Sequence, residues 1–361
     1  MSKERILITG AGGMLGNAIF PYVTSRFDTV SATDKDAEES WLETLDVRDI
    51  EAARKRFAKF QPTLVLHLAA CTDLEFCEVQ SQVAEETNAY ATGEIAALCE
   101  EYGATLVYIS TAGVFDGTKS GFYTEQDQPN PIMVYGKTKY DGELLAAARC
   151  SRHFIVRAGW MVGGGAAKDH KFVHHILGQI VAGEKTIRAV NDRFGTPTYT
   201  HDFALNLFRL LESGTVGTYH MVCEGSGTRH DVAKEILDIC GHQDIELLSV
   251  DSSYFASNYF APRPVSEMMI NANLRAQGLN LMRNWREALR DYILREFSHA
   301  MAGQIITGRD RRLRLERRKN DYAWNAIERR KAASRRGLDA GLLASRPEWR
   351  EGLRTGEVRS A

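Results

Sequence analysis

The chain has 361 residues, of which 44% are hydrophobic and 25% charged, so it is long enough to bury the core of one large or two medium domains. No apolar run reaches the roughly 18 residues of a membrane span, and a strand pattern begins almost at the first residue, so we expect a cytoplasmic protein with no membrane span. The six cysteines are scattered without a CxxC pair, which argues against a zinc ribbon and against a disulfide scaffold.

Charge divides the chain near residue 300. Residues 301–361 contain 16 Lys and Arg but 8 Asp and Glu, whereas the first 300 residues contain 29 Lys and Arg but 39 Asp and Glu, so the net charges are +8 and −10. The pattern predicts an acidic globular body followed by a basic C-terminal extension over 299–361. Such an extension can dock on the body, form an oligomer contact, or bind a polyanion such as nucleic acid or anionic lipid.

Short apolar runs alternate with helical patterns along the body. The expected strands, rich in Val, Ile and Leu, are 5–9, 29–33, 63–69, 105–110 and 154–159, and the expected helices include 80–101 and 134–149. This alternation is typical of an α/β fold in which helices cover both faces of a parallel, doubly wound sheet, the Rossmann arrangement.

A glycine-rich turn follows the first expected strand. The run Gly10-Ala11-Gly12-Gly13-Met14-Leu15-Gly16 stands between that strand and a helical pattern. Glycines let the backbone approach a pyrophosphate, whose charge is then met by the N–H groups of the helix N-terminus. We therefore predict a dinucleotide site at Gly10, Gly13, Met14, Leu15 and Gly16. The site belongs to an NAD(P)-binding Rossmann core over 1–160, and 161–298 are expected to supply the remaining sheet elements and a smaller, substrate-binding lobe.

An acidic residue closes the second expected strand. Asp34 lies 18 residues past Gly16, where a carboxylate accepts hydrogen bonds from the adenosine ribose and repels a 2′-phosphate, so the sequence favours NAD(H). Lys35 can pair with that phosphate, which keeps NADP(H) open, and a solvated turn over 34–36 is the plainer alternative. Asp46, followed by Val47, is expected at the adenine edge, with a surface aspartate as the alternative.

Two hydroxyls end the strand expected at 105–110. Ser110 and Thr111 stand where a parallel sheet binds its ligands, so we expect them to face the nicotinamide. Tyr135 follows 24 residues after Thr111 and begins a YxxxK pattern that ends at Lys139. Positions i and i+4 share a helix face, so the ammonium of Lys139 is predicted to lower the pKa of the Tyr135 phenol for proton transfer.

Together these motifs resemble the extended short-chain dehydrogenase/reductase family, and within it the dTDP-4-dehydrorhamnose reductases. The resemblance covers about 290 residues and includes ITGAGGMLG, HLAACTDLEFCE, YISTAGVFDG, YGKTKYDGE, VRAGWMVGGG and RPVSEMMINANL. It implies hydride transfer between a nicotinamide and the carbonyl of a nucleotide sugar in deoxysugar biosynthesis, with Thr111, Tyr135 and Lys139 as the catalytic residues. A homo-oligomer is also expected.

The same resemblance implies further binding residues. Cofactor contacts are implied at Ala69, Ala70, Asn88, Ser110, Tyr135 and Lys139, and substrate contacts at Thr72, Thr111, Ala112, Gly113, Trp160, Arg193 and Arg263. No metal is expected, because the histidines at helical spacing over 170–175 have no companion Cys or carboxylate cluster.

The chain departs from the family pattern directly after Thr111. Reductases of this kind usually carry Asp-Tyr there and the related 4,6-dehydratases carry Asp-Glu, whereas this chain has Ala112-Gly113. Dehydration needs an extra acid and base, which Ala-Gly lacks, so we expect a reductase of a 4-keto sugar nucleotide and not a dehydratase. A sugar-nucleotide epimerase is one alternative. The other is a non-catalytic, cofactor-binding regulatory subunit like that of methionine adenosyltransferase.

Overall fold

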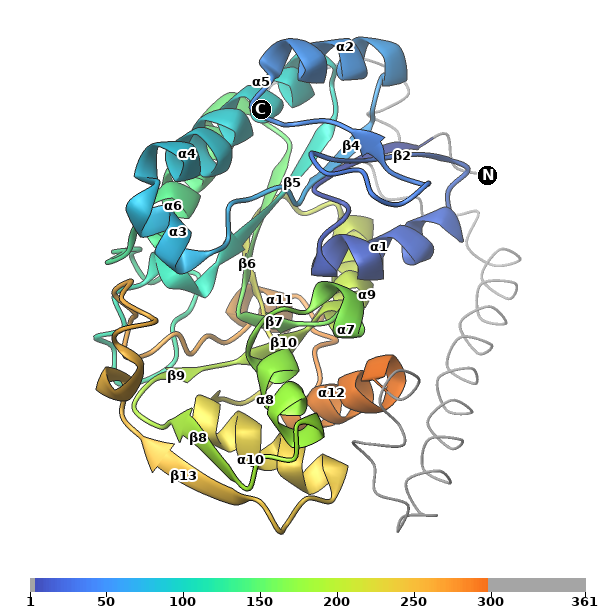
Figure 1. Ribbon diagram of the computed structural model, residues 1–361. Helices are drawn as coiled ribbons and strands as arrows, with labels where there is room; N and C mark the ends of the chain where they lie inside the picture. The colour runs from blue at the N-terminus through green and yellow to red at the C-terminus, as the bar shows by residue number, and fades with distance from the viewer. Residues whose placement is uncertain (1–3, 298–361) are drawn as a thin grey trace.

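Figure 1 shows the computed structural model, which describes residues 4–297. The predicted basic extension, 299–361, lies outside these residues. A larger part built on one sheet fills the upper half of the view, and a smaller lobe lies below it. Between residues 4 and 297, no helix has the length and apolar character to cross a membrane.

The larger part is built on seven parallel strands in the order β11-β6-β5-β4-β1-β2-β3. The strands are β1 (Arg5–Thr9), β2 (Thr29–Asp34), β3 (Glu43–Thr44), β4 (Leu64–His67), β5 (Thr105–Thr111), β6 (His153–Ala158) and β11 (Gly217–Met221). The direction in which strands are added reverses between β1 and β4, and sheets of this kind bind ligands at that switch point. The predicted doubly wound α/β fold is confirmed.

Helices cover both faces of the sheet (Figure 1). Helices α1 (Met14–Thr24) and α9 (Thr200–Ser213) pack together on one face, and α2 (Ile50–Phe60), α5 (Ala91–Glu101) and α6 (Val134–Arg149) cover the other. Successive side chains of a strand point to opposite faces. Accordingly, Ile6 and Ile8 of β1 join the core beneath α1, while Leu7 packs with α2 and α5. Burial on both faces explains why these strands appear in the sequence as continuous apolar runs.

The helix expected over 80–101 contains a π-helical turn. After α3 (Leu74–Val79), the chain continues as α4 (Ser81–Glu85), the π-helical turn Glu86–Tyr90, and α5. Single π turns inside α-helices occur frequently at functional sites. This one carries Asn88, whose side chain is fully buried and faces the carboxyl ends of the strands through its contacts with the loop after β4.

The smaller lobe is assembled from three two-stranded sheets and short helices. Its strand pairs are β7 (Trp160–Val162) with β10 (Pro197–Tyr199), β9 (Phe194–Gly195) with β12 (Gly227–Thr228), and β8 (Thr186–Val190) with β13 (Glu246–Val250). Its helices are α7 (Gly165–Lys168), α8 (Phe172–Val181), α10 (Arg229–Cys240), α11 (Ala272–Ala276) and α12 (Trp285–Tyr292), with a 3-10 turn at Ser252–Phe255 and a π turn at Ile293–Phe297. Another 3-10 turn, Ala112–Val114, directly follows β5 in the larger part. Thr228 and Asp231 form a reciprocal capping box that fixes the start of α10.

Candidate active site

The glycine-rich turn between β1 and α1 lies against the loop after β4. Gly10 has a φ of +69°, and a Cβ atom there would lie 2.4 Å from the backbone N of Ala69. A Cβ atom on Gly16 would lie 2.1 Å from the carbonyl oxygen of Ala11. Both positions therefore require glycine, one for close approach of two loops and one for the tight entry into α1.

The N-terminus of α1 is open to a ligand. Gly13 is the N-cap residue, no side chain caps the helix, and no acidic residue stands in its first turn, where Met14 and Leu15 begin the helix. The first N–H groups of the helix are thus available to an anion. The backbone N–H of Gly12 donates to Oδ2 of Asp34 at 2.9 Å, which ties the turn to the end of β2. This cradle fits the pyrophosphate and ribose of a dinucleotide.

The acidic residues expected at the adenosine end differ in their partners. Asp34 is half-buried at the end of β2 and uses one oxygen for the turn. Lys35 is exposed and pairs with Asp36 at 3.3 Å. Asp46 pairs with Arg48 at 2.6 Å, and hydrogen bonding to Arg48 holds the pKa of Asp46 below its usual range. Val47 is buried behind it.

The structure brings the three residues of the predicted catalytic set together at the end of β5. Thr111 is the last residue of β5, and Tyr135 and Lys139 lie one turn apart at the start of α6. Thr111 Oγ1 accepts the backbone N–H of Gly113 at 3.1 Å. Burial raises the pKa of the Tyr135 phenol, and hydrogen bonding to the Thr111 side chain lowers it by less. The phenol therefore carries its proton at neutral pH.

Lys139 is buried, and its Nζ lies 4.1 Å from the centroid of the Tyr108 ring. Burial lowers the pKa of Lys139 to about 7, while the charge of Glu143 raises it. The sequence predicts that Lys139 lowers the pKa of Tyr135, but burial dominates at the phenol and raises its pKa overall, and the Lys139 ammonium lies over the Tyr108 ring.

A buried ion pair that the sequence analysis did not include lies behind Lys139. Glu143 accepts from Arg157 at 2.9 and 2.7 Å, and the Ser110 hydroxyl donates to the same carboxylate at 2.5 Å. The Ser110 hydroxyl is thus already hydrogen-bonded to Glu143, and Ser110 supports the site through this buried contact. The spacing of Tyr135, Lys139 and Glu143, four residues apart on one helix face, is the sequence signal that would have identified Glu143.

Asn88 fixes the loop after β4. Its side chain accepts the N–H of Cys71 at 2.8 Å and donates to the Cys71 carbonyl at 3.0 Å and to Thr138 at 3.1 Å. The loop that carries Ala69 and Ala70 is thereby tied to α6, and Thr72, the next residue after Cys71, is exposed. The Asn88 side chain therefore positions this loop by hydrogen-bonding the backbone of Cys71.

The 3-10 turn after Thr111 packs directly on α6. A Cβ atom on Gly136 would lie 2.0 Å from the carbonyl oxygen of Gly113, so only glycine allows this contact. Ala112 and Gly113 are both buried. Helix α6, which carries Tyr135 and Lys139, therefore packs on the turn through direct contact between the two backbones.

An acid reaches this part of the site from the smaller lobe. The Trp160 indole donates to Oε2 of Glu267 at 2.7 Å, and Oε1 of Glu267 lies 3.6 Å from the Cβ position of Gly113. Burial raises the pKa of Glu267, while Trp160 and Arg229 lower it by less. Ala112-Gly113 carries neither the acid nor the base of a dehydratase, and Glu267 brings one carboxyl group close to this turn from a distant part of the chain. It remains one acid, with one oxygen already bonded.

Two arginines of the predicted substrate set line the smaller lobe. Arg193 contacts Asp192 at 2.9 Å, and its Nε has no hydrogen-bond partner within the described part of the chain. Arg263 pairs with Glu75 of α3 at 2.7 Å and lies 5.3 Å from the Tyr259 ring centroid. The ion pair between Arg263 and Glu75 joins the smaller lobe to the larger part.

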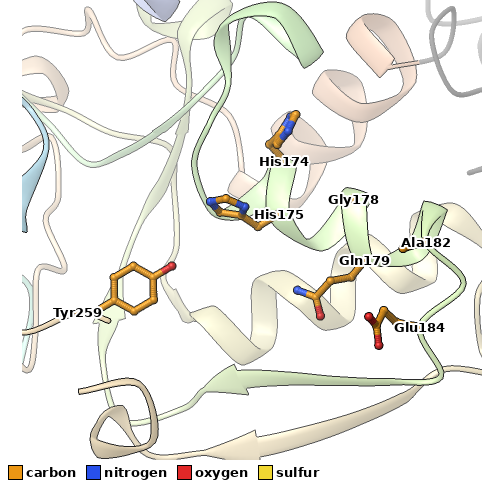
Figure 2. A pocket seen from close by; sticks show the side chains of 7 residues that line it. All are labelled: His174, His175, Gly178, Gln179, Ala182, Glu184 and Tyr259. Carbon is orange, nitrogen blue, oxygen red and sulfur yellow. The ribbon is translucent and has the colours of Figure 1, made fainter. Parts of the chain in front are cut away.

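A separate open pocket of about 480 Å³ lies on the smaller lobe (Figure 2). His175 and Gln179 lie along α8, Glu184 lies just past the end of that helix, and Tyr259 lies across from it. None of the predicted catalytic residues lines it. Residues 4–297 contain no group of three or more His, Cys, Asp or Glu side chains arranged to hold a metal, so His170, His174 and His175 do not form such a site.

Comparisons with known proteins agree with this arrangement. The family model described as the RmlD substrate binding domain matches residues 4–297. A dTDP-4-dehydrorhamnose reductase from Streptomyces griseus is 31% identical over 293 residues, which cover 80% of this chain and 92% of the relative. The mouse methionine adenosyltransferase 2 subunit beta is 28% identical over 295 residues, which cover 80% of this chain and 87% of the relative.

Solved structures give the same result. The crystal structure of dTDP-4-dehydrorhamnose reductase from Bacillus anthracis in complex with NADP superposes with a TM-score of 0.74 at 30% identity, covering 81% of this chain and 99% of that one. A family model that spans nearly all described residues, together with relatives of this identity and coverage, shows that the chain belongs to the family defined by the RmlD substrate binding domain.

Proposed function

We propose that this protein is an NAD(P)H-dependent reductase of a dTDP-linked 4-keto-6-deoxy sugar, the kind of activity for which its relatives are named, and that it serves deoxysugar biosynthesis. The observation that carries the proposal is the meeting of Thr111, Tyr135 and Lys139 at the carboxyl end of β5, opposite the open N-terminus of α1. The names of the relatives supply the substrate class.

When bound, the reduced nicotinamide would supply the hydride for the carbonyl carbon. Tyr135 gives its proton to the carbonyl oxygen, and its raised pKa keeps that proton in place until the more basic alkoxide develops. Thr111 donates its hydroxyl to the same oxygen and holds the substrate beside the phenol. Lys139 binds the nicotinamide ribose, and Glu143 helps to keep it protonated.

The binding roles follow the two parts of the fold. Residues 10–16, Asp34 and the loop at Ala69-Ala70 hold the cofactor, with Asn88 positioning that loop. Trp160, Glu267, Arg193 and Arg263 face the nucleotide sugar from the smaller lobe. We propose residues 1–160 and 161–298 as the corresponding cofactor and substrate domains.

The test is a screen of dTDP-linked keto sugars in which the absorbance of reduced nicotinamide is followed. A reductase consumes the cofactor in step with product, whereas an epimerase isomerises the sugar without net consumption. A regulatory subunit is the second candidate, favoured by the likeness to the mouse subunit and by Ala112-Gly113. Such a protein binds cofactor but turns over no keto sugar.

The proposal includes a homo-oligomer that works in the cytoplasm. Large apolar side chains remain exposed on adjoining elements of the larger part, at Val79, Tyr90 and Leu144, and they support self-association. Light scattering on the full chain, compared with Leu144→Glu, tests the oligomer.

A further inference from the structure

Two cysteines lie side by side next to the catalytic set. All six cysteines of the chain fall within the described residues and are free thiols. Cys71, in the loop after β4, is half-buried, and Cys77 on α3 is buried, with 3.6 Å between their Sγ atoms. The remaining four are buried elsewhere. Cys71 is thus the one cysteine that a reagent reaches without unfolding, and a partner thiol stands beside it.

The contact between the two sulfurs is directional. The Cys77 thiol donates toward Cys71 Sγ, and it also lies 3.7 Å from the Cys71 carbonyl oxygen. This hydrogen bond lowers the pKa of Cys71 to about 7 although burial raises it, so Cys71 is the member of the pair that forms a thiolate more readily. It raises the pKa of Cys77 in turn. The Asn88 side chain hydrogen-bonds both the N–H and the carbonyl of Cys71, which holds Cys71 in place beside Cys77.

We propose that Cys71 and Cys77 form a thiol–disulfide site at the edge of the active site, and that it takes low-molecular-weight disulfides such as oxidised glutathione. Both thiols lie close enough to Tyr135 to raise the pKa of its phenol. Thr72, a proposed substrate residue, is the neighbour of Cys71, and Glu75 on the same helix as Cys77 carries the ion pair to Arg263. Oxidation of Cys71 and Cys77 therefore changes the surface where the nucleotide sugar is expected to bind.

The chemistry proceeds in two balanced exchanges. The Cys71 thiolate attacks one sulfur of oxidised glutathione, forms a mixed disulfide, and releases one glutathione thiolate. With Cys71 no longer charged, the hydrogen bond and the repulsion that raise the pKa of Cys77 are gone. Cys77 then loses its proton to solvent and attacks Cys71 Sγ, which forms the protein disulfide and releases the second glutathione. Two protein thiols lose two electrons, and the glutathione disulfide gains them.

Closing this bond changes the loop. The sulfurs must move from 3.6 Å to about 2.05 Å, the length of a disulfide. Cys71 lies in the same loop as Ala69 and Ala70, the proposed cofactor contacts, and Asn88 ties the backbone of Cys71 to the rest of the protein. We expect oxidation to weaken cofactor binding, and dithiothreitol to restore it.

The test uses the full reduced chain, oxidised glutathione at neutral pH, and an alkylating quench followed by peptide mass mapping. We expect a Cys71–Cys77 cross-link, with Cys71 reacting at least about tenfold faster than Cys99, Cys150, Cys223 or Cys240. Cys77→Ala should stop at a glutathione adduct on Cys71, and Cys71→Ser should give neither product. Cys150→Ser, which removes a buried thiol elsewhere, should behave like the unaltered protein.

Two results would overturn the proposal: a folded protein that gives no Cys71 product, or one in which the four buried thiols react as fast as Cys71. If Cys71→Ser fails to fold by circular dichroism, Cys77→Ala still decides between the mixed and the internal disulfide. The readout is mass and not turnover, so the result stands independently of the proposed reductase activity.

Discussion

The indole Nε1 of Trp160 donates a hydrogen bond to the carboxylate of Glu267, and this pair places an acid beside the turn after Thr111. The guanidinium of Arg229 lies 3.8 Å from the centroid of the Trp160 ring and completes the arrangement. Burial raises the pKa of Glu267 and lowers the pKa of Arg229 to about 10, so both groups sit in a site largely shielded from water. A sugar hydroxyl that enters here meets a preformed acceptor.

The first prediction concerns Glu267→Gln. The amide keeps the shape and can still accept from Trp160, but it removes the charged acceptor, so we expect the KM for the keto sugar to rise about 10-fold or more, the scale of one hydrogen bond to a charged group. Cofactor affinity should not change. Steady-state kinetics and a cofactor titration measure both. Glu212→Gln, an exposed site on α9, is the control, and an unaltered KM in Glu267→Gln would remove this residue from the substrate site.

Tyr135→Phe should leave the cofactor bound and lower turnover by ~10²-fold or more, because the proton donor is lost while the ring stays. Tyr140→Phe on the same helix removes a hydroxyl that accepts a hydrogen bond from the Gln128 side chain at 3.3 Å, and it should keep normal turnover. Single-turnover kinetics with reduced nicotinamide separate the two. Near-normal turnover in Tyr135→Phe would discard the catalytic assignment.

Thr111→Val keeps the shape of the side chain and removes its hydroxyl. We expect a loss of about 2–4 kcal/mol in kcat/KM, the cost of one transition-state hydrogen-bond donor. Thr105→Val, at the opposite end of β5, controls for effects on the strand. A loss confined to thermal stability, with kcat/KM unchanged, would show that Thr111 serves the fold alone.

Asp34→Asn tests cofactor choice. The amide oxygen can still accept the N–H of Gly12, so the turn is kept while the negative charge that repels a 2′-phosphate is removed. We expect the unaltered protein to prefer NAD(H) over NADP(H), and the variant to show a preference several-fold smaller. Asp36→Asn, which leaves Asp34 intact, should keep the original ratio. A strong preference of the unaltered protein for NADP(H), the cofactor bound to the Bacillus anthracis relative, would reject the role of Asp34 and point to Lys35.

Stability should fall in mild acid because of buried histidine. His67 bonds to Thr9 at 2.7 Å and to Thr92 at 3.1 Å, and burial lowers its pKa to about 3. The unfolded chain takes up a proton near pH 6.5 and the folded ring does not until about pH 3, so stability is lost as pH falls through this window. At pH 5 this one ring costs about 2 kcal/mol relative to pH 8.

Urea denaturation of the unaltered protein and of His67→Gln at pH 5 and pH 8 measures this linkage. The variant should show a smaller difference between the two pH values, whatever its absolute stability. His175→Gln, an exposed site on α8, should retain the full difference. An equal pH dependence in all three proteins would show that His67 does not titrate as described.

Local patterns predicted much of the fold. The strand expected at 5–9 and the helix expected at 134–149 match β1 and α6 residue for residue, because burial on both faces and regular helical spacing leave clear periodic signals. The π turn at Asn88 left no such signal. An extra residue within a helix changes the hydrogen bonding without changing the composition.

The candidate site was predictable only where its parts are close in sequence. Tyr135 and Lys139 form one helical pattern, and Glu143 continues it. Glu267 stands beside Gly113 although the two are far apart along the chain, and a contact of that kind depends on how the smaller lobe folds back. The pKa of Tyr135 was mispredicted for a similar reason: spacing places a cation near the phenol but says nothing about the burial that outweighs it.

The glycine contact between the 3-10 turn and α6 sets where the enzyme tolerates redesign. A side chain at Gly113 would meet first the Cε atom of Met133, the end of a flexible side chain, at 2.6 Å, whereas a side chain at Gly136 would meet a backbone oxygen at 2.0 Å. A methionine can change rotamer, but the Gly113 carbonyl belongs to the 3-10 turn, so a side chain at 136 would displace either that turn or the helix that carries Tyr135. Libraries aimed at new sugar acceptors should therefore vary position 113 and keep glycine at 136.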